Sequence, residues 1–244
     1  MTVLVILELY PQHLAVNGDT GNVTVLAKRL ELAGIDAVRL GHNPGDNLPE
    51  RVDIVTIGTG PVSAQRVLEA DVAAIAATLR SWRDDGVPML AVSGGMQLLG
   101  TSIQAPGGAA ITGAGVFDLK TDATAARVVT NSFSVDTDLG RLTGIENHGS
   151  RTILGVGTVP FGRIVTGVGN GDESSGAAGS EGVWVRNAIG THLQGPVLAM
   201  NPVLADHFIT IAVERAGISY ATTAEHARID AIAKTTRSLL GADA

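Results

Sequence analysis

The sequence contains no cysteine, which excludes disulfide bonds, thiolate zinc sites and a cysteine nucleophile. Charged residues are also scarce, at 17% of the 244 residues, and the basic ones form no run that would indicate a nucleic-acid-binding surface. The apolar runs either contain charges or are too short to span a bilayer. The first residues lack the basic start and small-residue cleavage site of a signal peptide. We therefore expect a cytoplasmic protein with no transmembrane segment and no nucleic-acid partner.

Hydrophobic residues make up 45% of the chain, enough for a sizeable core. In the first half, apolar runs that are rich in β-branched residues alternate with segments whose apolar residues recur at helical spacing. This alternation predicts βαβ units and a mainly parallel sheet, with functional groups at the carboxyl ends of the strands. The predicted strands are Val3–Leu9, Ala37–Leu40 and Val52–Ile57, and the predicted helices are Val23–Ala33, with Asn22 as its cap, and residues 63–83.

The second half has a different pattern. Residues 101–190 are rich in Gly, Thr and Val, which predicts short, partly antiparallel strands such as Arg163–Val168 and Gly182–Ile189, with a loop over Gly169–Gly182 between them. Two further helices are predicted over residues 203–216 and 223–240. The length suits one domain over residues 1–244, with the last helical segment, 223–244, at its periphery.

The stretch from Val87 to Gly100 carries the strongest local signal. An apolar run ends at Ser93, two glycines follow, and the apolar spacing then becomes helical. A strand, a tight turn and a helix in this order have the geometry of a nucleophile elbow, with backbone N–H groups at the helix start facing the reacting atom. A small residue at an ordinary tight turn would give the same pattern, and Val-Ser-Gly-Gly is not the Gly-x-Ser-x-Gly of serine hydrolases.

Other candidate groups are weaker when taken singly. Gly58-Thr59-Gly60 follows a predicted strand and could either donate N–H groups to an oxyanion or form a plain turn. Among six histidines, His148 lies in a polar segment and His192 ends a predicted strand. No group of His, Asp and Glu has metal-ligand spacing, so we expect no metal site.

Together these pieces resemble the class I glutamine amidotransferases. The elbow matches their pattern of apolar-Cys-Gly-Gly-aromatic-Gln-x-x-Gly, and the finer match is to the CobB/CobQ-like branch, and within it to the GatD glutaminase subunits of lipid II isoglutaminyl synthases. The resemblance implies a flavodoxin-like α/β fold. The other matching segments are Gly18–Asn22, Gly58–Gly60 with Gln65, Glu146–Gly149 with Arg151-Thr152, Gly167–Asn170, Gly190-Thr191 with Leu193, Gly195-Pro196, and Asn201-Pro202 with Leu204–Asp206.

The resemblance also implies a chemistry. In the family, the elbow cysteine attacks the side-chain amide of glutamine, a histidine in a Leu-His-Gly-Pro segment moves the proton, and a Gly-rich strand end stabilises the oxyanion. The ammonia passes to a partner, which for GatD is MurT, an ATP-dependent Mur ligase subunit that amidates the D-glutamate of lipid II. No cofactor is implied for the glutaminase subunit. Gly58, Thr59, Gly60 and Gly94 fall at the oxyanion positions, and Arg127 falls where an arginine holds glutamine.

The chain departs from the family at both chemical positions. Ser93 replaces the cysteine, and its hydroxyl needs a positioned base because it does not ionise near pH 7. Gln194 replaces the histidine and cannot act as a base because its amide does not titrate. Thr59 adds bulk to the strand end. These changes predict an amidotransferase subunit whose glutamine hydrolysis is impaired or lost.

Two alternatives remain open from the sequence. If residues 190–194 are extended, His192 points to the same face as Gln194, and a Ser93–His192 dyad could hydrolyse glutamine. The second alternative is a non-catalytic protein that uses the cleft to bind a small molecule or to regulate a partner.

Overall fold

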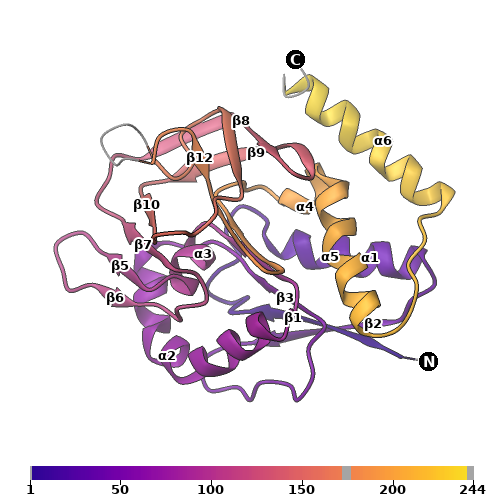
Figure 1. Cartoon of the computed structure of the whole chain (residues 1–244), viewed down its shortest axis with the longest axis horizontal. Coiled ribbons are helices and arrows are strands. Elements are labelled where there is room, and N and C mark those ends of the chain that lie inside the picture. Colours follow the sequence, from indigo (N-terminus) through magenta and orange to yellow (C-terminus); the bar gives the residue numbers. More distant parts are fainter. Residues whose placement is uncertain (1, 172–176, 241–244) are drawn as a thin grey trace.

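A six-stranded sheet forms the centre of the computed structural model, which describes residues 2–171 and 177–240 (Figure 1). Its strand order is β13-β14-β4-β3-β1-β2. All neighbouring pairs are parallel except the β13–β14 hairpin. The order β2-β1-β3-β4-β14 is the flavodoxin-like one, so the predicted fold class is confirmed. The strands are β1 (Leu4–Leu9), β2 (Ala37–His42), β3 (Ile54–Ile57), β4 (Met89–Val92), β13 (Val183–Val185) and β14 (Ala188–Thr191).

Helices cover both faces of this sheet, which explains why its central strands, β1, β3 and β4, are almost wholly apolar. Because successive strand residues point to opposite faces, Val55 packs with α2 in one core cluster and Ile54 packs with α1 and α5 in the other. The helix α6 lies at the edge of the molecule (Figure 1). The helices are α1 (Thr20–Leu32), α2 (Val62–Asp84), α3 (Gly94–Leu99), α4 (Val197–Met200), α5 (Pro202–Arg215) and α6 (Ala224–Leu239). None of the helices in the described ranges is long and apolar enough to cross a membrane.

The second half of the chain forms two four-stranded sheets, in the orders β10-β7-β5-β6 and β12-β11-β8-β9. Their pairs are antiparallel except β5–β7, as the short alternating segments predicted. A bridge between Ile145 in β9 and Gln194 attaches the second of these sheets to the end of β14. The strands are β5 (Ser102–Gln104), β6 (Ile111–Thr112), β7 (Leu119–Asp122), β8 (Val128–Thr137), β9 (Gly140–His148), β10 (Arg151–Leu154), β11 (Gly162–Thr166) and β12 (Ser180–Glu181).

Two local predictions were wrong. The first helix begins at Thr20, one turn before the predicted start, and Asn22 lies inside it rather than capping it. The Asn22 side-chain oxygen instead accepts a hydrogen bond from the backbone N–H of Leu198, 3.0 Å away. The segment predicted as one strand, residues 182–189, is a hairpin that turns at Arg186, where φ is 54°.

The predicted loop over residues 169–182 is also only partly correct. Its end forms the short strand β12, Ser180–Glu181. Residues 172–176 of that prediction lie outside the described residues. The position of β12 matters because it brings Glu181 beneath the end of β14, where Glu181 bonds His192.

Candidate active site

Ser93 lies at a sharp turn between β4 and α3. Its backbone has φ 46° and ψ −104°, a conformation that L-residues rarely adopt, and its N–H donates to the carbonyl of Thr191 at 2.7 Å. The turn needs the glycines that follow: a Cβ on Gly94 would lie 2.8 Å from the Gly60 carbonyl oxygen, and one on Gly95 would lie 2.7 Å from that of Gly58. The strand, turn and helix predicted for this stretch are therefore confirmed.

The strained backbone at Ser93 gives a stability prediction. A non-glycine residue held at such φ and ψ values costs about 1–3 kcal/mol. We expect Ser93→Gly to raise the free energy of unfolding by about 1 kcal/mol or more, because glycine adopts φ > 0 without a steric penalty. Urea unfolding measures this, and Ser150→Gly, outside the elbow, should not stabilise the chain. A loss of stability in Ser93→Gly would contradict the strain.

Ser93 opens into a cleft of about 560 Å³ at the carboxyl ends of β3 and β4. The cleft is bounded by the loop that follows β1, by the start of α2 and by the end of β9. Among its lining side chains, only Arg127 and His148 are basic. The lining residues are Val16, Asn17, Thr59, Gly60, Pro61, Val62, Gln65, Ser93, Gly94, Gln97, Ala123, Ala125, Arg127, Asn147, His148, Gly149 and Ser150.

The backbone N–H groups that would face an oxyanion already have partners. The N–H of Gly94 donates to the hydroxyl oxygen of Thr59 at 3.1 Å, and the N–H of Thr59 donates to Asp19 Oδ2 at 2.6 Å. Gly58 lies behind this strand end and does not line the cleft. A Cβ there would lie 2.1 Å from the Leu14 carbonyl oxygen. The Thr59 side chain therefore occupies the donor next to the nucleophile position.

Asp19 is a buried carboxyl group that the sequence analysis did not single out. Its Oδ1 atom has no hydrogen-bond partner among the described residues. Burial, reinforced by the nearby charge of Glu8 and opposed by the Thr59 N–H, raises the pKa of Asp19 to about 7. Its position directly before α1 was visible in the sequence, but its contact with Thr59, 40 residues away, was not.

The raised pKa of Asp19 makes the stability of the chain depend on pH. The native state keeps a proton that the unfolded state releases above pH 4, so the free energy of unfolding falls as pH rises from about 4 to 7, by up to about 1.4 kcal/mol per pH unit. We expect Asp19→Asn to remove this slope and to be the more stable form at pH 8. Urea unfolding at pH 4.5 to 8 measures it, with Asp36→Asn on an exposed aspartate as the control. A variant less stable than the native chain at pH 8 would overturn this assignment.

Gln194 connects two walls of the cleft. Its side-chain oxygen accepts a hydrogen bond from Asn17 Nδ2 at 2.5 Å, and its Nε2 donates to the backbone carbonyl of Asn147 at 3.2 Å. Arg127 lies beside this contact, where its Nη2 donates to Asn147 Oδ1 at 2.6 Å. The amide at the family histidine position thus makes two structural hydrogen bonds, and Arg127 remains exposed at the cleft.

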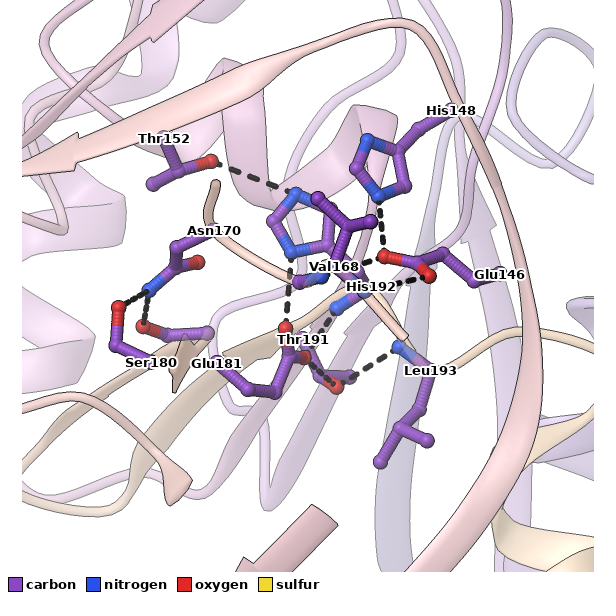
Figure 2. Close-up of polar contacts among 12 residues, drawn as sticks. Glu146, His148, Thr152, Val168, Asn170, Ser180, Glu181, Thr191, His192 and Leu193 are labelled. Carbon is purple, nitrogen blue, oxygen red and sulfur yellow. Dashed lines mark hydrogen bonds and ion pairs between the residues drawn. The ribbon is translucent and has the colours of Figure 1, made fainter. Parts of the chain in front are cut away.

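His192 lies in a buried polar network beneath the cleft, shown in Figure 2. Its Nδ1 atom is 3.1 Å from Glu181 Oε2, and its Nε2 atom is 3.4 Å from Thr152 Oγ1. His192 is not among the residues that line the cleft, and no hydrogen bond joins it to Ser93 among the described residues. A Ser93–His192 dyad would require Nε2 to leave Thr152, while Nδ1 keeps its bond to Glu181.

The same network contains a second histidine, and this one reaches the cleft. The ring of His148 lies against that of His192 (Figure 2), with centroids 4.3 Å apart and planes tilted by 32°. Its Nε2 atom is 2.9 Å from Glu146 Oε1. Burial, and then the neighbouring His192, lower the pKa of His148. Burial opposes the effect at Glu146, but the hydrogen bond from His148 and the N–H groups of Val168 and Gly169 hold the pKa of this carboxyl below its usual value.

Part of this network could have been found from the sequence. Residues two apart on a strand point to the same face, so a strand over residues 145–148, which was not predicted, would make Glu146 and His148 neighbours. Nothing in the sequence pairs His192 with Glu181, because Glu181 falls in a segment that reads as a loop.

Comparison with known proteins places the chain in a family. Residues 9–202 match the CobB/CobQ-like glutamine amidotransferase domain. The GatD subunit of the glutamine-hydrolysing lipid II isoglutaminyl synthase of Staphylococcus aureus (strain N315) is 32% identical over 220 residues, which cover 89% of this chain and 87% of the relative. The corresponding subunit of Streptococcus pneumoniae (strain ATCC BAA-255 / R6) is 32% identical over 217 residues, which cover 86% of this chain and 80% of the relative.

Solved structures share the fold at lower sequence identity. A glutamine amidotransferase crystal structure superposes with a TM-score of 0.55 at 17% identity and covers 87% of this chain and 99% of its own. A glutamine amidotransferase from Thermotoga maritima gives 0.53 at 13% identity, with coverages of 98% and 94%. At these identities the likeness establishes the fold alone.

Proposed function

Because the chain belongs to the CobB/CobQ-like glutamine amidotransferase family, we propose that it is a GatD-like subunit whose glutamine hydrolysis is impaired or lost. Its partner in this proposal is a MurT-like, ATP-dependent Mur ligase that amidates the D-glutamate of lipid II in the cytoplasm. Two relatives named as GatD subunits of lipid II isoglutaminyl synthase, each 32% identical over most of the chain, support this pathway.

The observation that carries the impaired hydrolysis is the hydrogen bond from the Gly94 N–H to the Thr59 hydroxyl. Amide hydrolysis passes through a tetrahedral oxyanion, and losing one donor to it costs about 10²–10³-fold in kcat. Thr59 occupies that donor, while the N–H of Thr59 itself is committed to Asp19. Hydrolysis is thus disfavoured twice, because the oxyanion lacks free N–H donors and because serine replaces the cysteine nucleophile.

The proton-transfer step faces a separate obstacle. Serine needs a base within about 2.6–3.2 Å of its hydroxyl, and the Ser93 hydroxyl has no hydrogen-bond partner among the described residues. Gln194 holds Asn17 and Asn147 and cannot accept a proton. His192, the substitute base in the alternative proposal, is bonded to Glu181 and Thr152. Neither side chain is hydrogen-bonded to the Ser93 hydroxyl among the described residues, which supports the impaired hydrolysis.

The cleft itself retains the groups that would recognise glutamine. Arg127 offers a guanidinium for a carboxylate, and the amides of Gln65 and Asn147 line the same space. We propose that glutamine binds here without being cleaved, and that this occupied state is what the ligase partner senses. The proposed role of the chain is therefore structural or regulatory within the complex.

Glutamine binding and partner capture test this proposal. We expect L-glutamine to bind by isothermal titration calorimetry without ammonia release, and Arg127→Gln to raise Kd by about 10-fold or more, the value of one charge-assisted hydrogen bond. Arg39→Gln, on the exposed strand β2, is the matched control. A MurT-like ligase should co-purify with the native chain. No glutamine binding together with no ligase capture would refute the proposal.

A further inference from the structure

The cleft contains a second serine whose hydrogen bonds differ from those of Ser93. Ser150 lies between β9 and β10, and its Oγ atom is 3.2 Å from Nδ1 of His148. The other ring nitrogen of His148, Nε2, is 2.9 Å from Oε1 of Glu146. Both Ser150 and His148 line the cleft, and Glu146 is fully buried behind them. A hydroxyl, an imidazole and a carboxylate therefore follow one another in hydrogen-bond contact.

The directions of these hydrogen bonds are set by Glu146. Its Oε2 accepts the N–H of Val168 at 3.0 Å and its Oε1 accepts the N–H of Gly169 at 2.6 Å, contacts that favour the ionised carboxylate. An ionised carboxylate only accepts, so Nε2 of His148 carries a proton. In the neutral imidazole Nδ1 then has a free lone pair. It lies 3.2 Å from two oxygens of Ser150, the hydroxyl and the backbone carbonyl, and of these only the hydroxyl can donate to it.

A third group orients the Ser150 hydroxyl from the opposite side. Nε2 of Gln97, in α3, donates to Ser150 Oγ at 3.0 Å, and Gln97 Oε1 accepts from Gln65 Nε2 at 2.8 Å. With its oxygen accepting from Gln97, the Ser150 hydroxyl can direct its proton to His148. The second N–H of the Gln97 amide has no acceptor among the described residues and lies next to the attacking oxygen.

We propose that Ser150, His148 and Glu146 form a nucleophile, base and carboxylate array that cleaves small carboxylic esters in this cleft. Ser93 has the strained elbow without a base, whereas Ser150 has a base held by a buried carboxylate. Arg127, exposed in the same cleft, favours an ester whose acyl group carries a free carboxylate. This activity goes beyond the proposed role in lipid II amidation, and the ester occupies the same cleft, beside the same Arg127, as the glutamine of that proposal.

The reaction balances with groups of the chain and water. Ser150 Oγ forms a bond to the ester carbonyl carbon as its proton passes to His148 Nδ1, and the Gln97 amide donates to the resulting oxyanion. Collapse breaks the bond to the leaving oxygen, which takes the proton from His148. Water, deprotonated by His148, then attacks the acyl group, the bond to Ser150 Oγ breaks, and that oxygen recovers its proton while the carboxylic acid leaves.

Covalent labelling with a fluorophosphonate tests the array without knowledge of the natural ester. Peptide mass spectrometry of the labelled native chain should place one adduct on Ser150. The adduct should be absent in Ser150→Ala and unchanged in Ser63→Ala, an exposed serine of α2 outside the cleft. The labelling rate should fall about 10²–10⁴-fold in His148→Gln, the usual contribution of a general base.

The pH profile of labelling separates catalysis from a structural role of His148, should His148→Gln not fold. The imidazole is flanked by Glu146 on its own strand, by His192 and, through it, by Glu181. We expect the labelling rate to fall once as the pH is lowered, with its midpoint below the ordinary histidine pKa of about 6.5. An adduct on Ser93, no adduct on Ser150, or a pH-independent rate would overturn the proposal.

The substrate preference has its own readout. Hydrolysis of 4-nitrophenyl hemisuccinate should exceed that of 4-nitrophenyl acetate, and Arg127→Gln should abolish the difference by raising KM for the hemisuccinate with kcat unchanged. Equal rates for the two esters in the native chain would refute the assigned substrate class.

Discussion

A chain carrying Ser93→Cys, Gln194→His and Thr59→Gly together is expected to release ammonia from glutamine. The thiol ionises near neutral pH, the imidazole supplies a base, and removing the Thr59 side chain frees the Gly94 N–H for the oxyanion. We expect measurable glutaminase activity from the first two changes and a further increase of about 10²–10³-fold from the third. A coupled ammonia assay at saturating glutamine gives kcat for each combination.

Two comparisons make that series decisive. The same chain with Ser93→Ala in place of Ser93→Cys lacks the nucleophile of the elbow and should release no ammonia. Thr59→Ser, which keeps the hydroxyl, should leave the activity of the two-residue variant near its starting value, because an oxygen can still accept the Gly94 N–H. If Thr59→Gly and Thr59→Ser raise kcat equally, the hydroxyl is not what occupies the oxyanion donor.

Replacing Arg29 by methionine is expected to cost about 3 kcal/mol of stability. The guanidinium lies in α1 with its side chain almost fully buried, and it bonds Asp206 of α5 at 2.6 and 2.7 Å and Asp230 of α6 at 2.7 Å. Its loss leaves two carboxylates without their cation. The expected cost lies at the lower end of about 3–5 kcal/mol because both carboxylates are partly exposed to water.

Arg228 offers a matched control on α6 itself. It pairs with Glu225 at 2.6 Å, but both side chains are largely exposed, so Arg228→Met should cost less than about 1 kcal/mol. Urea unfolding measures both variants, and amide hydrogen exchange shows whether α6 loses protection first in Arg29→Met. Equal losses in the two variants would mean that burial does not distinguish these ion pairs.

The elements that the sequence predicted well are those with local causes. The elbow at Ser93 could be predicted because its signals are neighbours in the sequence. They are an apolar run with β-branched residues, a pair of glycines and a change to helical spacing of the apolar residues. The mainly parallel sheet followed from the alternation of strands and helices before Gly95, since parallel strands need crossovers. Its flavodoxin-like order was implied by the family resemblance. The start of α1 was misplaced because Asn22 has the chemistry of a cap and uses it on Leu198 instead, 176 residues away.

The parts of the site that the sequence did not predict depend on contacts between distant residues. Thr59 was recognised as bulk near the oxyanion, but its hydrogen bond to the Gly94 N–H requires the ends of β3 and β4 to lie side by side. Gln194 reads as the loss of a base, whereas its bonds to Asn17 and Asn147 show that it also joins two walls of the cleft. Spacing alone carries no information on either contact.

Ammonia release from L-glutamine by the unaltered chain, alone and in complex with a MurT-like ligase, is the most direct test of the impaired-hydrolysis account. The account predicts a rate equal to that of Ser93→Ala under both conditions, since the elbow has neither a base nor a free Gly94 N–H. Release that exceeds the Ser93→Ala background, in the complex or without it, would contradict the account.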